Sequence, residues 1–225
     1  MNQNVKELVT DIDQLSIFCD AIDPRKEGKL LQEIVLALKN TMREKGLLSL
    51  SAPQIGYSRR VFCIRFGEND YRTFINPVIE NVANFTMNRE SCSSLPNKEY
   101  IRPRHATCKV YYLTPMNKIE SRKLVGVAAF KFQHCLDHLD GMVLSDIGLE
   151  IDELWDKATE EERDEVLRAY MDALDIAEKE CKKAVAEDKE LADIDDASKF
   201  IASVQSGETK LEFIEEDSKD VNTDN

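Results

Sequence analysis

The amino-acid sequence predicts a fold of mixed helix and strand class, and three observations along the chain predict it. Apolar residues recur at helical spacing over residues 27–45. Runs rich in β-branched and aromatic residues fill the middle, residues 47–125. Helical spacing then returns over residues 126–139 and dominates after about residue 148.

The first long helix is expected at about residues 27–45. Before it, residues 1–23 show a short, helix-compatible apolar period, and Asp23-Pro24 indicates a turn. The apolar positions of the helix repeat at spacings of three and four: Leu30, Leu31, Ile34, Val35, Leu38 and Met42. Gly46 then ends the helix, because glycine readily adopts the left-handed conformation found at many helix ends.

Strands are expected in the middle of the chain, separated by polar turns. The strand-like runs are 59–66, 72–80, 107–114 and 121–128, and the turns are 67–70 and 114–117. A second helix follows over residues 126–139 and is closed by Gly141.

The last third of the chain shows only helical periodicity. Thr159 and Glu162 have the spacing of a capping box at the start of a long acidic helix. We therefore divide the chain into a domain over 1–150, an acidic helical extension over 151–190 and an acidic tail over 191–225. From about residue 188 the periodicity is weak, and a loosely held end is expected there.

Charge distribution and composition exclude several functions. The net charge of −13 is unevenly distributed. Residues 1–149 carry +3 (20 Lys/Arg, 17 Asp/Glu), and residues 150–225 carry −16 (10 Lys/Arg, 26 Asp/Glu). The acidic tail should therefore repel nucleic acid and anionic membranes. The chain has no apolar run long enough for a membrane span and no signal-peptide pattern, so a cytoplasmic protein is expected. The six scattered cysteines are expected to be thiols or metal ligands.

A metal site is suggested by the stretch "QHCLDHLDG" (133–141). His134 and His138 are four residues apart, which places both imidazoles on one face of a helix. Cys92, in "RESCSSLP" beside a predicted strand, is a candidate third ligand. Three protein ligands leave a fourth position open, which is the arrangement of a catalytic metal site.

With these residues the chain resembles the peptide deformylase family, metalloenzymes that remove the formyl group from the N-terminal methionine of nascent chains. Three family motifs occur in the family's order, as "LLSLSAPQ" (47–54), "ESCSS" (90–94) and "QHCLDHLDG" (133–141). The resemblance covers roughly residues 5–150. It implies an α+β fold, with antiparallel strands around a central metal-binding helix and the acidic helical extension added at the C-terminal end.

The resemblance assigns roles to individual positions. Cys92, His134 and His138 match the metal ligands, and Gln54 and the backbone N–H of Ser93 match the donors to the formyl oxygen. Glu90, Arg104 and Asp137 match residues that support the ligands. The metal is one divalent ion, with Fe2+ expected in cells and Zn2+ or Ni2+ also compatible with these ligands.

Several positions depart from the family pattern. Leu47, Ser49 and Ser91 stand where the family has glycine, so their side chains narrow the cleft. The expected substrate pocket is formed by Leu48, Ser49, Phe130 and Lys131. Lys131 stands where the family has an apolar pocket wall, so the lysine either reshapes the methionine pocket or swings outward along its stem.

Cys135 is the departure that bears most on activity. It occupies the catalytic position of the family's glutamate, which takes a proton from the attacking water and delivers it to the leaving amine. The cysteine sulfur lies two bonds closer to the backbone than a glutamate oxygen, so it is expected to fall short of the water. As a fourth metal ligand Cys135 is disfavoured, because adjacent helical residues point about 100° apart.

Three functions remain open from the sequence. The chain is a slow, atypical deformylase, or a pseudoenzyme that binds formyl-methionyl N-termini or a protein partner without turnover, or a structural module whose acidic tail is the functional part. The implied partner of the first two is a formyl-methionyl peptide or nascent chain, with the ribosome as a possible further partner.

Overall fold

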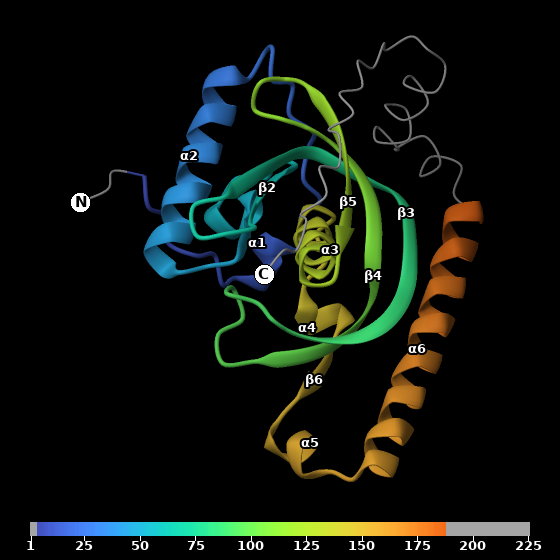
Figure 1. Ribbon diagram of the computed structural model, residues 1–225. Coiled ribbons are helices and arrows are strands. Elements are labelled where there is room, and N and C mark those ends of the chain that lie inside the picture. Colours follow the sequence, from blue (N-terminus) through green and yellow to red (C-terminus); the bar gives the residue numbers. More distant parts are fainter. Residues whose placement is uncertain (1–3, 188–225) are drawn as a thin grey trace, which may run out of the picture.

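A curled antiparallel sheet wraps around one central helix in the computed structural model, which describes residues 4–187 (Figure 1). The strands follow the order β1-β2-β3-β4-β5, and β6 pairs with β4. Their bounds are β1 Ser49–Ser51, β2 Val61–Arg65, β3 Tyr71–Ser91, β4 Glu99–Leu113, β5 Ile119–Val125 and β6 Leu149–Ile151. The expected α+β architecture is confirmed.

The central helix α3 (Val127–Leu139) is held by apolar packing and by one polar anchor. Phe132 packs edge-on against Phe62 and Phe74 of the sheet, with ring centroids 5.0 and 5.3 Å apart. The Gln133 amide donates to the backbone oxygen of His105 in β4 and accepts from the His105 N–H. The side chain of Gln133 therefore pairs with β4 as a neighbouring strand's peptide group does, and this fixes the position of the helix against the sheet.

Helix α2 (Gly28–Lys45) covers a second apolar cluster on the outside of β1 and β2. Its buried side chains include Leu31, Ile34, Leu38 and Met42, at the predicted helical spacing. Gly46 follows with a φ of 67°, and its N–H bonds to the Met42 oxygen, which confirms the predicted end.

Strands β3 and β4 form a hairpin that is much longer than the sequence predicts. The runs 72–80 and 107–114 mark only their more apolar halves, because half of residues 81–88 of β3 are polar and none of these residues is buried. Pairing nevertheless continues from Asn81 to Ser91, which faces Glu99. A register shift between Ile75 and Val78 accommodates Pro77, which cannot donate to the ladder, and a second shift lies between Ile79 and Asn81. The long hairpin brings Glu90 and Cys92 to the central helix.

The structure differs from the sequence pattern near both ends of the described residues. Residues 4–23 are mainly without regular structure, with one short helix, α1 (Ile12–Leu15), and their apolar residues are divided among three apolar clusters. The segment after residue 148 is not purely helical, since β6 pairs with residues 99–101 of β4.

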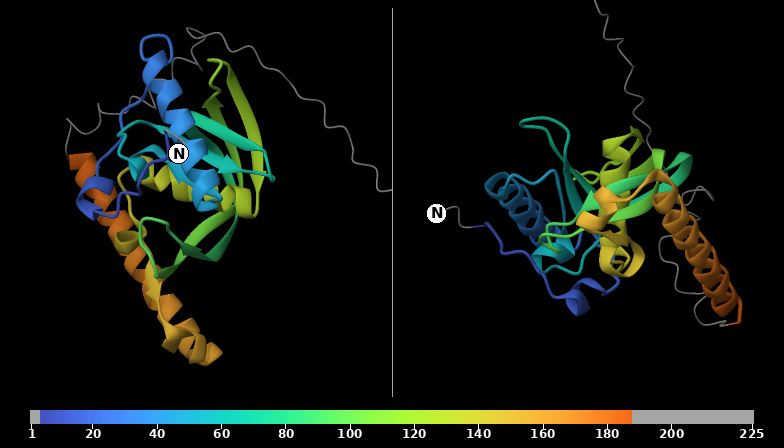
Figure 2. Two further views of the ribbon diagram at one scale, coloured as in Figure 1. Left: turned by 90° about the vertical axis from the view of Figure 1, so that its left-hand side faces the viewer. Right: turned by 90° about the horizontal axis from the view of Figure 1, so that it is seen from below.

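The expected acidic helix is present as α6 (Glu160–Glu187), after the short helices α4 (Leu144–Ile147) and α5 (Glu153–Lys157). The Thr159–Glu162 capping box is confirmed by reciprocal hydrogen bonds. Helices α2 and α6 lie on opposite sides of the sheet (Figures 1 and 2). The predicted tail over 191–225 lies outside the described residues. Among residues 4–187, no helix is both long and apolar enough to cross a bilayer.

Candidate metal centre

Cys92, His134 and His138 come together in the structure although they are far apart in the sequence. Cys92 directly follows β3, and the two histidines lie one turn apart on α3. The Cys92 Sγ is 3.2 Å from the His138 Nε2, and the ligand atoms of all three residues lie within 4.8 Å of one another. All three side chains are buried. A thiolate and two imidazoles at this separation form a donor set that suits Zn2+, Fe2+ or Ni2+.

A carboxylate orients the first histidine. The Nδ1 of His134 lies 2.9 Å from a carboxylate oxygen of Glu90, so the Nε2 is left for a metal ion. Burial alone lowers the pKa of His134, but hydrogen bonds with Cys92 and Glu90 raise it to about 9. Burial raises the pKa of Cys92, yet hydrogen bonds from the two histidines lower it to about 5. The hydrogen bonds among Cys92, Glu90, His134 and His138 therefore favour the thiolate form of Cys92, which is the form that binds metals.

Arg104, on β4, links the hairpin to the metal-bearing helix. Its guanidinium donates to both oxygens of Glu90 at 2.6 and 2.9 Å, and its Nη1 lies 2.7 Å from the Asp137 Oδ2. Burial raises the pKa of Glu90, but the hydrogen bonds from Arg104 and His134 hold it below its ordinary value. Glu90 and Arg104 are both almost fully buried, so the charge of Glu90 is compensated mainly by Arg104 and not by water.

Gln54 points its amide group at the candidate ligands from the short helix η1 (Ala52–Ile55). The Ser51 N–H and hydroxyl both donate to the Gln54 Oε1, at 3.0 and 2.9 Å, and this fixes which way the amide faces. The Nε2 then lies 3.4 Å from the Cys92 sulfur and within 3.3 Å of the Ser93 and Ser94 hydroxyls. An amide nitrogen has two hydrogens, so it cannot satisfy all three acceptors at once.

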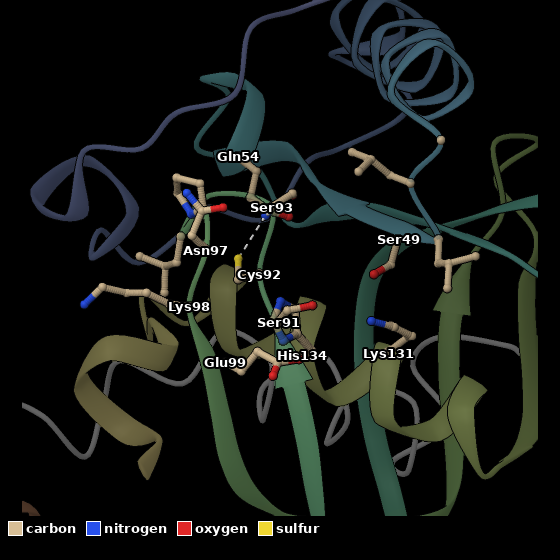
Figure 3. Close-up of a pocket in the computed structure, with 15 residues that line it drawn as sticks. Ser49, Gln54, Ser91, Cys92, Ser93, Asn97, Lys98, Glu99, Lys131 and His134 are labelled. Carbon is tan, nitrogen blue, oxygen red and sulfur yellow. Dashed lines mark hydrogen bonds between the residues drawn. The ribbon is translucent and has the colours of Figure 1, made fainter. Parts of the chain in front are cut away.

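A cavity of about 640 Å³ opens in front of this cluster (Figure 3). Gln54, Cys92, Ser93 and His134 form its wall, and Ser91 and Leu95 also line it. A second cavity of about 180 Å³ adjoins the first and shares Lys131 and His134 with it. The four predicted pocket residues divide between the two: Leu48 and Ser49 line the large cavity, Phe130 lines the small one, and Lys131 lines both.

Cys135 lies outside both cavities. Its side chain is fully buried in the apolar cluster with Phe62 and Phe132, next to the Ser49 hydroxyl. Burial raises the pKa of the Cys135 thiol to about 12, and the Ser49 hydroxyl and Lys131 act in the opposite direction. Cys135 is not part of the ligand cluster found among residues 4–187. The thiol therefore neither faces the cavity nor ionises at neutral pH.

Two residues of the site were not singled out from the sequence. Ser51 orients the Gln54 amide, and Ser94 accepts from it. Ser51 had a recognisable signal, because Ser-x-x-Gln is the spacing of a capping box, and the structure shows both of its reciprocal bonds. Ser94 had none, since its role depends on how the loop after β3 is folded.

The chain matches one protein family over most of its described length. The family model described as polypeptide deformylase covers residues 6–150. A peptide deformylase of Treponema pallidum (strain Nichols) is 32% identical over 143 residues, which are 62% of this chain and 80% of that protein. A peptide deformylase of Orientia tsutsugamushi (strain Boryong) is 28% identical over 130 residues, which are 52% of this chain and 72% of that protein.

Solved structures show the same fold. A peptide deformylase from Thermotoga maritima superposes with a TM-score of 0.58 at 27% identity, over 64% of this chain and 97% of that one. A class I type b peptide deformylase from Acinetobacter baumannii, solved with Met-Ala-Ser bound, gives a TM-score of 0.58 over 63% of this chain and 97% of that one. At 23% identity, the second likeness supports the fold alone.

Proposed function

Because the chain belongs to the polypeptide deformylase family, we propose that it is a deformylase-like metalloprotein whose rate is limited by Cys135. Its reaction would be hydrolysis of the formyl amide at the N-terminus of a formylated peptide. The observation that carries the proposal is the buried cluster of Cys92, His134 and His138 beside the Gln54 amide.

Cys92, His134 and His138 would hold one divalent ion. When bound, such an ion supplies Lewis-acid polarisation of a carbonyl and lowers the pKa of water. Glu90 fixes the His134 ring for this role, and Arg104 holds Glu90 ionised. We expect Fe2+ in the cell, because the ligand set accepts several metals and availability decides among them.

Gln54 would stabilise negative charge on the formyl oxygen. Its Nε2 already faces the cavity wall next to Cys92, and Ser51 holds it in that orientation. The Ser93 backbone N–H is the second proposed donor, on the same wall. The substrate oxygen must displace the Ser93 and Ser94 hydroxyls, which share the Gln54 hydrogens in the free chain.

Gln54→Ala is expected to lower single-turnover hydrolysis of N-formyl-Met-Ala-Ser by about 10²–10³-fold, because one donor to the developing oxyanion is removed. Metal content measured in parallel should stay at the wild-type level, since Gln54 is not a proposed ligand. Ser94→Ala, which removes a competing acceptor and leaves the amide in place, is the control and should retain the wild-type rate or exceed it. An unchanged rate in Gln54→Ala refutes the assigned role.

Proton handling is the step that this chain lacks. The Cys135 thiol is buried away from the cavity, and its pKa of about 12 keeps it protonated. General acid–base assistance by a well-placed group contributes about 10²–10⁴-fold to a rate. The same observation favours the second candidate function, in which the cleft binds formyl-methionyl N-termini or a protein partner without turnover.

Purification without oxygen, followed by metal analysis and an N-formyl-Met-Ala-Ser assay, tests the proposal. We expect about one metal ion per chain and slow turnover in the wild type, and neither in His138→Ala. His105→Ala is the matched control, because this third histidine lies on β4 outside the ligand cluster. Metal and hydroxamate-inhibitor binding without turnover would favour the binding function. Absence of bound metal contradicts both functions.

We expect the chain to act in the cytoplasm, where nascent formylated chains emerge from ribosomes. The acidic C-terminal part is not expected to contact nucleic acid, because its charge has the same sign.

A further inference from the structure

A small cavity lies beside the candidate metal centre. Its volume of about 180 Å³ corresponds to about six water molecules. It begins at Ser91 and His134, which also line the large cavity where the reacting amide would lie. In the proposed reaction, the side chain of the first residue, next to the reacting amide, would therefore be the group that reaches this cavity.

One charge in this pocket lacks a partner. Glu90 is paired with Arg104 and His134, and Glu99 is paired with Arg89. Lys131, which also lines the pocket, has no carboxylate within 4 Å among residues 4–187. The pocket thus offers an ammonium group whose donors are not used by the protein itself.

The Lys131 side chain is directed into the site. Figure 3 shows its nitrogen pointing toward Ser91 and His134. Phe130 and Val127, on the same helix, line the small pocket with apolar surface. Lys131 itself is only partly exposed. An ion pair next to apolar walls is stronger than one in open water, because the local dielectric constant is lower.

We propose that Lys131 makes this pocket selective for an acidic first side chain, so that N-formyl peptides beginning with glutamate are preferred over those beginning with methionine. The inference rests on the proposed function, since it assigns the substrate class of the same site. A carboxylate would pair with the Lys131 ammonium while its methylene groups lie against Phe130. A methionine side chain would leave the ammonium partly desolvated and without a partner.

Two measurements with the metal-loaded full chain test the preference. Hydrolysis of N-formyl-Glu-Ala-Ser and N-formyl-Met-Ala-Ser gives the ratio of kcat/KM, and calorimetry with Glu-Ala-Ser and Met-Ala-Ser gives a binding ratio that does not depend on turnover. We expect both ratios to favour glutamate by about tenfold, as for a hydrogen bond between charged groups. Lys131→Met keeps the side-chain length and should reverse the preference. Lys123→Met, an exposed lysine on β5, is the matched control and should leave both ratios unchanged.

The outcomes separate this inference from the proposed function. If neither formyl peptide is hydrolysed but Glu-Ala-Ser binds better, and Lys131→Met abolishes the difference, the hydrolase proposal fails and the pocket assignment stands. If both formyl peptides are hydrolysed with a preference for methionine that Lys131→Met leaves unchanged, the hydrolase stands and the pocket assignment is overturned. A glutamate preference that persists in Lys131→Met also overturns it, and so does a chain that binds neither tripeptide.

Discussion

Cys135→Glu is expected to raise the rate of N-formyl-Met-Ala-Ser hydrolysis by about 10²–10⁴-fold, which is the usual contribution of a positioned acid–base group. The cysteine sulfur is buried next to the Ser49 side chain, which lines the large cavity, whereas a glutamate carboxylate extends two bonds further from the backbone. We expect that extra length to bring the carboxylate to the cavity. Assays of the hydrolysis rate for both proteins at equal metal occupancy would measure the increase.

Cys135→Gln is the matched control, because glutamine has the same length but cannot take up and release the proton. It should leave the rate near that of the wild type. Since Ser49 crowds the path of the longer side chain, adding Ser49→Gly to Cys135→Glu should increase the gain further. Equal rates for the wild type and Cys135→Glu would show that proton transfer does not limit this chain.

Arg104→Leu is expected to lower the free energy of unfolding by about 3–5 kcal/mol, the usual cost of removing one member of a buried ion pair. Arg104 is 3% exposed and bonds Glu90 and Asp137, so the variant leaves two carboxylates without their cation. Urea unfolding monitored by circular dichroism would give the difference. The loss should be accompanied by weaker metal binding, because Glu90 orients His134.

Arg89→Leu is the control for that measurement. Arg89 also pairs with two carboxylates, those of Glu99 and Asp156, but it is 47% exposed, and its loss should change stability by less than about 1 kcal/mol. The cost of Arg104→Leu should also depend on pH. In the folded wild type the pKa of Glu90 is lowered, so the stability it contributes is present above the unfolded pKa and lost as pH falls through the folded pKa. In Arg104→Leu the carboxyl takes up a proton more readily, so the cost should shrink toward about pH 4. If Arg104→Leu and Arg89→Leu lower the free energy of unfolding equally, the buried ion pair contributes no more to stability than a surface pair.

The fold could be predicted as far as local periodicity reaches. The helices over 28–45 and 127–139 match the predicted ranges closely, because each buries one apolar face. The outer half of the β3–β4 hairpin could not be predicted, since no side chain of residues 81–88 is buried and this segment is held by pairing with another strand. Strand β6 has three residues, too few for an alternating pattern, and it exists only because β4 lies beside it.

The candidate site could be predicted as a set of positions but not as a shape. The motifs placed Gln54, Cys92, His134 and His138 in the chain. The structure brings the first three to one cavity wall, with His138 beside Cys92 behind it. The sequence did not reveal that the pocket residues divide between two cavities, because this depends on the folded positions of the residues that line both, Ser91, Glu99, Lys131 and His134. Orientation of the Gln54 amide by Ser51 is likewise a property of the folded turn.

The separation of the ligands along the chain has a consequence for folding. Cys92 and His138 are 46 positions apart, and they meet only after the long hairpin has paired and α3 has docked against β4. An unfolded chain therefore presents no preassembled site, and the formation of these non-local contacts is expected to be a late event. Any ion that binds here acts selectively on the native state, and at a hundredfold excess over its Kd it would add about 2.7 kcal/mol to the stability of the whole domain. Metal supply in the cell would then set the lifetime of this protein as well as its occupancy.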